Sequence, residues 1–159
     1  MGSRLLLLIL AILGGSAGAD AADGAAGKAL FAEHCVPCHQ EGGSGASGVA
    51  PRLAGTLAAR LKHPQGRESL ASTLVSGMIG AIKVDGETFT GLMPSFAARS
   101  DEELAALAAY LVQELNGDGL APDLADLAPE EFAAARRRLA TPGDVFRQRQ
   151  RLVAATGGK

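Results

Sequence analysis

The chain has 159 residues, a formal net charge of −2 and 47% apolar residues, which suits one compact domain. The near-neutral charge argues against nucleic acid as a partner. Aromatic residues make up only 4% of the chain and tryptophan is absent, so large side chains are scarce in the core. This scarcity favours a cofactor bound in the interior.

The first 21 residues have the pattern of a secretory signal peptide. Arg4 is followed by an apolar run over residues 5–13, and small residues then allow cleavage after Ala19 or Ala21. The apolar run is about half of the ~20 residues needed to cross a bilayer, so a retained anchor is the less favoured alternative. We therefore expect residues 1–21 to be removed. The mature protein is expected to lack a membrane span and to be periplasmic.

A helical segment then leads into the sequence CVPCH, which contains the only two cysteines, Cys35 and Cys38, and ends at His39. A disulfide between these cysteines would close a very small loop and restrain little unfolded-chain entropy. A dithiol redox site is expected after a strand, whereas here a helix precedes the motif. A zinc site needs four ligands, and the remaining histidines are only His34 and His63.

The favoured interpretation of CVPCH is covalent attachment of one haem c, for which C-x-x-C-H is the signature. Cys35 and Cys38 can each form a thioether to one vinyl group, and His39 can then ligate the iron. Arg52 and Lys83 are candidates for pairing with the haem propionates, although a solvated charge is the favoured state of both.

A second axial ligand decides whether such a haem carries electrons or binds other molecules. Met93 is favoured, because Pro94 keeps it extended in the stretch TGLMPSF, which we expect to be a loop. The alternatives are Met78, His34 and His63. Met78 lies in an apolar run at helical spacing, where a core role is expected, and His63 has the setting of a surface histidine.

Two further elements follow from local sequence signals. The stretch GAIKVDGETFTG contains an Asp-Gly pair at 85–86, which predicts a short β-hairpin. The stretch SDEELAALAAYLVQEL opens with Ser100 and Glu103, a capping-box pair, and its leucines recur at helical spacing. This predicts a long helix that ends near Leu115.

The last part of the chain contains a near repeat with a period of thirteen residues, in which 128–139 aligns with 141–152. Pro129 and Pro142 suit the first positions of two short helices, and Thr141 can cap the second. The two helices would either pack on the body of the protein or bind a protein partner. The predicted apolar stripes consist of Phe132, Ala135, Leu139, Val145, the stem of Arg149, and Leu152.

Over residues 24–115 the chain resembles class I c-type cytochromes. CVPCH matches the haem motif of that family, and GLMPSF is similar to its methionine loop, with Met93 as the axial ligand. APRLAG resembles its proline loop, in which the Pro51 carbonyl accepts the proton of the His39 imidazole. The first and last helices of the family cross, and the residues that fit this crossing are Gly27, Phe31, Leu107 and Tyr110.

The resemblance implies an all-α cytochrome c fold around one covalent haem, with a β-hairpin excursion and a two-helix C-terminal extension. We expect a signal peptide at 1–21, a haem domain at 22–115, and a linker with the extension at 116–159. The expected function is one-electron transfer without catalysis. The extension looks like those of cytochromes that accompany periplasmic dehydrogenases or oxidases, which suggests such a redox partner. The alternative is a ligand-binding or catalytic haem protein, a gas sensor or peroxidase-like, with Met93 off the iron.

Overall fold

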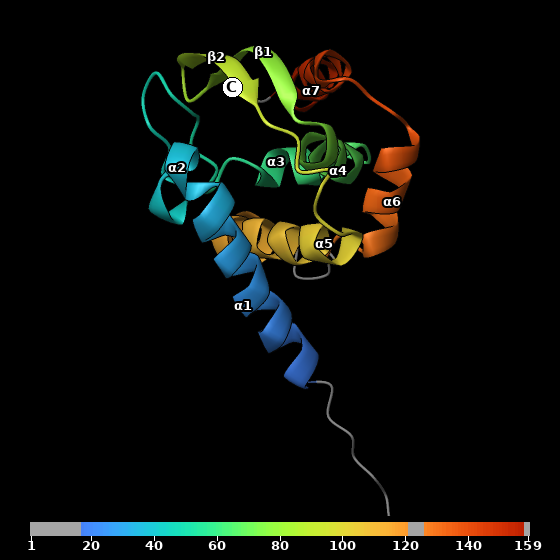
Figure 1. The fold of residues 1–159 in the computed structure, drawn as a ribbon. Coiled ribbons are helices and arrows are strands. Elements are labelled where there is room, and N and C mark those ends of the chain that lie inside the picture. Colours follow the sequence, from blue (N-terminus) through green and yellow to red (C-terminus); the bar gives the residue numbers. More distant parts are fainter. Residues whose placement is uncertain (1–16, 121–125, 158–159) are drawn as a thin grey trace, which may run out of the picture.

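A computed structural model describes residues 17–120 and 126–157 of the chain (Figure 1). Most of the predicted signal peptide, residues 1–16, therefore lies outside the described residues. In the described part the protein is mainly helical, with one two-stranded sheet, as the sequence predicts. No helix in this part is both long and apolar enough to cross a membrane.

The first long helix, α1 (Ala17–His34), crosses α5 (Asp101–Ala109) at the base of the molecule (Figure 1). The two helices touch at Gly27, where a Cβ would lie 2.1 Å from the carbonyl oxygen of Ala106. One turn later the rings of Phe31 and Tyr110 pack with centroids 5.2 Å apart. The predicted helix crossing is therefore confirmed.

The α5 helix begins at the predicted capping box, since the Ser100 side chain accepts the Glu103 N–H and the Glu103 carboxylate accepts the Ser100 N–H. It continues as a π-helical turn, η2 (Tyr110–Glu114). The shorter elements are α2 (Val36–His39), η1 (Glu41–Gly43), α3 (Ala58–Leu61), α4 (Gly66–Ser76) and η3 (Gly117–Gly119).

The predicted hairpin is present and longer than expected, because β1 (Met78–Val84) pairs along its whole length with β2 (Glu87–Met93). Asp85 and Gly86 both have positive φ, 53° and 84°, as the tight turn of a hairpin requires. The two methionines are cross-strand partners at the open end of the hairpin.

Two expectations about the methionines are therefore wrong. Met78 does not belong to a helix, because Gly77 takes a φ of 69° and ends α4 at Ser76. Met93 does not lie in a loop, since it is the last residue of β2. Cross-strand partners point to the same face of a sheet, so the hairpin presents both thioethers to one side.

Alternate residues of the hairpin point toward the body and away from it. The inward residues of the two strands line one pocket, described below: Met78, Gly80, Ile82, Val84, Phe89, Gly91 and Met93. On the outward side, Ile79 and Leu92 face each other across the strands and are 52% and 64% exposed. The inward face therefore provides most of the hairpin's contribution to the pocket, which Thr90 and Leu92 also line.

The C-terminal extension consists of α6 (Pro129–Arg137) and α7 (Pro142–Thr156), each with proline in its first turn as predicted. Both helices pack on the body: α6 against α4 and α5, and α7 against β1 and α4 (Figure 1). Phe132 is fully buried in the main core, and Val145 and Leu152 are buried beneath α7. Leu139, predicted to join the apolar stripe, is instead 86% exposed in the turn between the two helices.

Candidate haem site

The CVPCH motif lies where the chain changes direction between two helices. Cys35 follows the end of α1, and the single helical turn of α2 carries Cys38 and His39, with Pro37 in its first turn. Proline is tolerated there because the first turn of a helix has no N–H bond to lose. The cysteines are not bridged; Cys35 is buried and Cys38 is exposed.

The thiol chemistry of the motif does not fit a redox dithiol. Burial, followed by repulsion from Cys38, raises the pKa of Cys35 to about 11. A reactive dithiol needs a lowered pKa to form the nucleophilic thiolate. Among the described residues there is also no cluster of three His, Cys, Asp or Glu side chains that could hold a metal ion. The geometry thus supports neither the dithiol nor the zinc interpretation.

The imidazole of His39 is only 8% exposed and is oriented by the backbone of Pro51. Its Nδ1 lies 2.8 Å from the Pro51 carbonyl oxygen, which can only accept, so Nδ1 carries the proton. Burial lowers the pKa of His39, although the bond to the Pro51 carbonyl opposes this change. A neutral ring protonated at Nδ1 leaves the lone pair of Nε2 available as a metal ligand.

Beside this imidazole is a pocket of about 210 Å³, far larger than the ~10–15 Å³ that one water molecule needs. It is bounded by residues of the CVPCH motif, by α4, by the inward face of the hairpin and by α7. Most of its lining is apolar, with Leu74, Ile82, Val84 and Phe89 among the buried contributors. Such a slot suits a large, flat, mainly apolar group.

Of the four candidate sixth ligands, three line this pocket: Met93, Met78 and His34. His63 does not, and its Nδ1 instead accepts a hydrogen bond from the backbone N–H of Gln65. The sequence favoured Met93 and kept Met78 only as an alternative with an expected core role, because the break at Gly77 is not visible in the apolar periodicity.

Two arginines that the sequence did not indicate as binding residues also line the pocket. Arg149 of α7 is 7% exposed, and Arg60 of α3 lies close enough for the two positive charges to interact. Burial, followed by repulsion from Arg149, lowers the pKa of Arg60 to about 10. Arg149 donates to the carbonyl oxygen of Lys83 at 3.3 Å, and Arg60 is half-buried. Neither positive charge is neutralised by a carboxylate within the described ranges, and buried charges are costly, so the pair fits a bound group that carries acids of its own.

Of the two candidates named for this role from the sequence, Arg52 also lines the pocket and Lys83 does not. Arg52 forms an ion pair with Asp85 at 2.9 Å near the surface. Lys83 lies on the outward side of β1 and is exposed. The one sequence signal for Arg149 was its place in the apolar stripe of α7, between Val145 and Leu152, where a charged group is unexpected.

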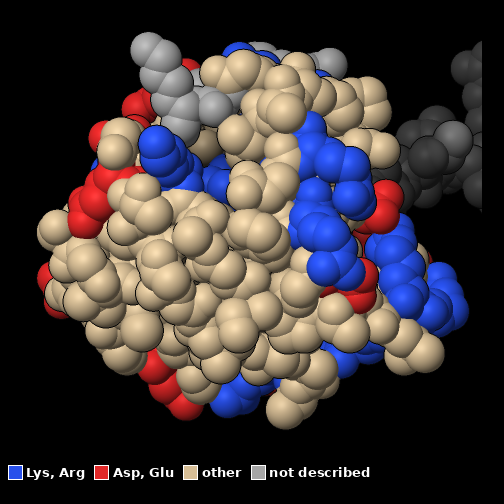
Figure 2. All heavy atoms as spheres, turned by 90° about the horizontal axis from the view of Figure 1, so that it is seen from above, with Lys and Arg blue, Asp and Glu red and all other residues tan. Residues whose placement is uncertain are grey.

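Seen from above, the hairpin side of the molecule presents a broad area with few charges, and Lys and Arg gather toward the extension (Figure 2). The extension carries exposed arginines on α7, among them Arg147 and Arg151. The surface on the hairpin side is thus weakly charged, while the surface toward the extension is more basic (Figure 2).

A helical body, an apolar slot beside a C-x-x-C-H turn and a buried neutral imidazole define a protein that holds a c-type haem. The family described as cytochrome c matches residues 24–114. Cytochrome c-552 of Thermus thermophilus is 35% identical over 118 residues, which cover 74% of this chain and 90% of that protein. A second cytochrome c-552, from a particular strain of the same species, is 36% identical over 118 residues, covering 74% of this chain and 80% of that protein.

The chain belongs to the cytochrome c family. It resembles the class I members in its helical fold. It binds haem c covalently through Cys35 and Cys38, and it is an electron-transfer protein.

Proposed function

We propose that this cytochrome is an exported, periplasmic one-electron carrier in which Nε2 of His39 and the sulfur of Met93 ligate the haem iron. The observation that carries this proposal is the 2.8 Å contact between His39 Nδ1 and the Pro51 carbonyl, which leaves Nε2 free beside a pocket that Met93 also lines. Haem, when bound, supplies the couple between ferric and ferrous iron. The thioether of Met93 is a soft ligand that favours the ferrous state and raises the reduction potential.

The chain's residues would support electron transfer rather than catalysis. With His39 and Met93 both holding the iron, no ligand position would remain for a substrate. The apolar lining would keep water away from a bound haem and so disfavour the additional positive charge of the ferric state. Within this proposal residues 22–115 form the haem domain, and 116–159 form a linker and an extension that packs on it.

A comparison of the two pocket methionines tests the axial ligand. We expect the oxidised protein to show the weak sulfur-to-iron band at the red edge of the visible spectrum. Met93→Ala should abolish this band, and the reduced variant should bind carbon monoxide readily because an axial position is open. Met78→Leu keeps the volume of the side chain and should keep the band.

The opposite result has a definite meaning in this comparison. If Met78→Leu removes the band and Met93→Ala does not, the axial sulfur belongs to β1 and not to β2. If the unmodified oxidised protein has no such band and its reduced form binds carbon monoxide rapidly, a ligand-binding or catalytic haem protein replaces the electron carrier.

Two of the pocket arginines, buried Arg149 and half-buried Arg60, support a second assignment, in which they bind the haem propionates. Arg149→Met retains much of the apolar stem and removes the charge. A nearby positive charge disfavours ferric iron. Removing the charge of Arg149 therefore stabilises the ferric state, and we expect the reduction potential to fall by on the order of tens of millivolts. Potentiometric titration measures this shift. The exposed Arg147, on the same helix but paired with Asp144, provides the control Arg147→Gln, and an equal shift in both variants would contradict the assignment.

A redox protein, a periplasmic dehydrogenase or oxidase, is the proposed partner. Support comes from the family's role in electron transfer and from the weakly charged surface over the hairpin (Figure 2). The extension does not need to be the docking element, since all residues of its predicted apolar stripes except Leu139 are already buried against the body. Periplasmic location is supported by the signal-peptide pattern of residues 1–21.

A further inference from the structure

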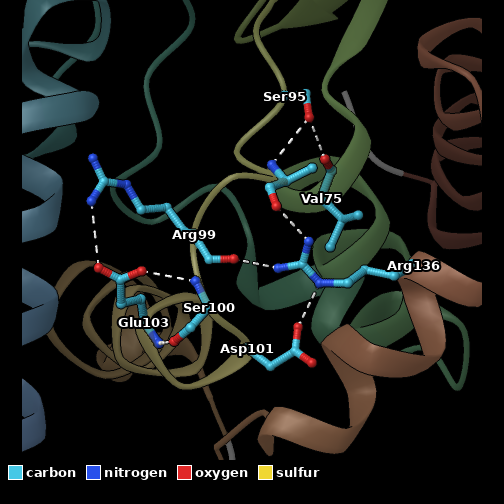
Figure 3. A network of polar contacts seen from close by, with 8 residues as sticks. Val75, Ser95, Arg99, Ser100, Asp101, Glu103 and Arg136 are labelled. Carbon is cyan, nitrogen blue, oxygen red and sulfur yellow. Dashed lines mark hydrogen bonds and ion pairs between the residues drawn. The ribbon is translucent and has the colours of Figure 1, made fainter.

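We call residues 94–100, which directly follow Met93, the methionine segment. Hydrogen bonds hold its first half against α4 (Figure 3). The hydroxyl of Ser95 donates to the carbonyl oxygen of Val75 at 2.6 Å. The same hydroxyl oxygen accepts the backbone N–H of Ala97 at 3.1 Å. These bonds hold the chain against the end of α4 immediately after the proposed iron ligand.

The second half of the methionine segment is held from the C-terminal extension by one side chain, Arg136 of α6 (Figure 3). Its Nη1 donates to the carbonyl oxygen of Ala97 at 2.6 Å, and its Nη2 donates to that of Arg99. Its Nε donates to Oδ1 of Asp101, in the first turn of α5, at 2.7 Å. All three guanidinium nitrogens donate at once to acceptors spread along the planar fork of arginine, whereas an ammonium group carries its three donors on a single nitrogen.

We propose that Arg136 is a positioning residue for Met93: by clamping the methionine segment, it keeps the Met93 sulfur on the iron. This inference rests on the proposed function, because it takes Met93 as the axial ligand. A shift of the methionine segment would draw the Met93 sulfur away from the iron, and the bonds from Arg136 oppose that shift. Ferric iron holds a soft sulfur less firmly than ferrous iron does, so the effect appears in the oxidised protein.

The physical consequence is a competition between Met93 and an added ligand. An outside ligand binds only to the fraction of molecules in which the methionine segment has opened, so its apparent affinity rises with that fraction. Loss of charge-assisted hydrogen bonds from Arg136 increases the open fraction. The C-terminal extension thus controls how easily the bond between Met93 and the iron breaks, although no residue of the extension binds the iron.

Imidazole, titrated into the oxidised full-length holoprotein, tests this proposal through the loss of the sulfur-to-iron band. We expect Arg136→Leu to bind imidazole at least about tenfold more tightly than the unmodified protein. The matched control is Arg138→Leu, at the end of the same helix. Arg138 pairs with Glu68 of α4 at 3.2 Å and does not touch the methionine segment. The affinity of the Arg138→Leu variant for imidazole should stay within about twofold of that of the unmodified protein.

A lysine variant separates positioning from general stability. Arg136→Lys can still pair with Asp101 but cannot bond both carbonyls. We therefore expect it to melt at a higher temperature than Arg136→Leu, while it still binds imidazole more tightly than the unmodified protein does. The proposal is overturned if Arg136→Leu and Arg136→Lys bind imidazole as weakly as the unmodified protein, or if Arg138→Leu tightens binding equally. An unmodified protein that lacks the band would instead refute Met93 ligation itself, which is a different failure.

Discussion

The Phe132→Ala variant is expected to lose about 3–5 kcal/mol of its free energy of unfolding. Phe132 lies on α6 and is fully buried, 0% exposed, in the same core as Phe31 and Leu104. Removing the ring leaves a cavity between α6 and the body, and the surrounding helices can fill it only in part. Chemical denaturation of the oxidised holoprotein, followed by far-ultraviolet circular dichroism, measures the loss.

Leu139→Ala is the control for this result, because Leu139 belongs to the same extension but is 86% exposed. We expect its stability to change by less than about 0.5 kcal/mol. A Phe132→Ala variant as stable as the control would show that α6 does not pack on the body in solution. Its apolar stripe would then be available to a partner protein, which is the alternative that the sequence left open.

Gly27→Ala should destabilise the protein by about 1–3 kcal/mol, although alanine is normally the better residue in a helix. A Cβ at this position would lie 2.1 Å from the carbonyl oxygen of Ala106. Because that atom belongs to the backbone of α5, the whole helix has to move to make room. The shift also separates the rings of Phe31 and Tyr110, which meet beside the crossing.

Gly24→Ala tests the same substitution in the same helix without the contact. A Cβ at Gly24 would have no atom within 4 Å, so the variant should gain up to about 1 kcal/mol from helix propensity. The two variants are therefore expected to shift the denaturation midpoint in opposite directions. Equal shifts would mean that α1 and α5 do not cross at Gly27.

Most features predicted correctly from the residues alone are decided within a few neighbouring residues, whereas the crossing of α1 and α5 at Gly27 was predicted from the family resemblance. The capping box at Ser100 needs only Glu103, the starts of α6 and α7 need only Pro129 and Pro142, and the hairpin turn needs only its Asp-Gly pair. The C-x-x-C-H motif is equally local. In each case the physical cause is a nearby hydrogen bond or a restricted backbone angle.

The features that the sequence did not reveal arise from packing between distant elements. Arg60 and Arg149 are separated by most of the chain and meet only because α7 packs against α3. Arg136 finds its carbonyl partners in a segment far away in the sequence. Met78 was misplaced for another reason: apolar spacing continues across Gly77, and only the positive φ of that glycine shows that the helix has ended.

The inward face of the hairpin has a consequence for the speed of electron transfer. Ile82, Val84 and Phe89 are less than a tenth exposed and carry neither charge nor a dipole that can rotate. When the charge at the metal centre changes by one unit, this wall has little to rearrange. A small nuclear reorganisation lowers the activation barrier, so exchange with a partner of nearly equal potential can remain fast in both directions.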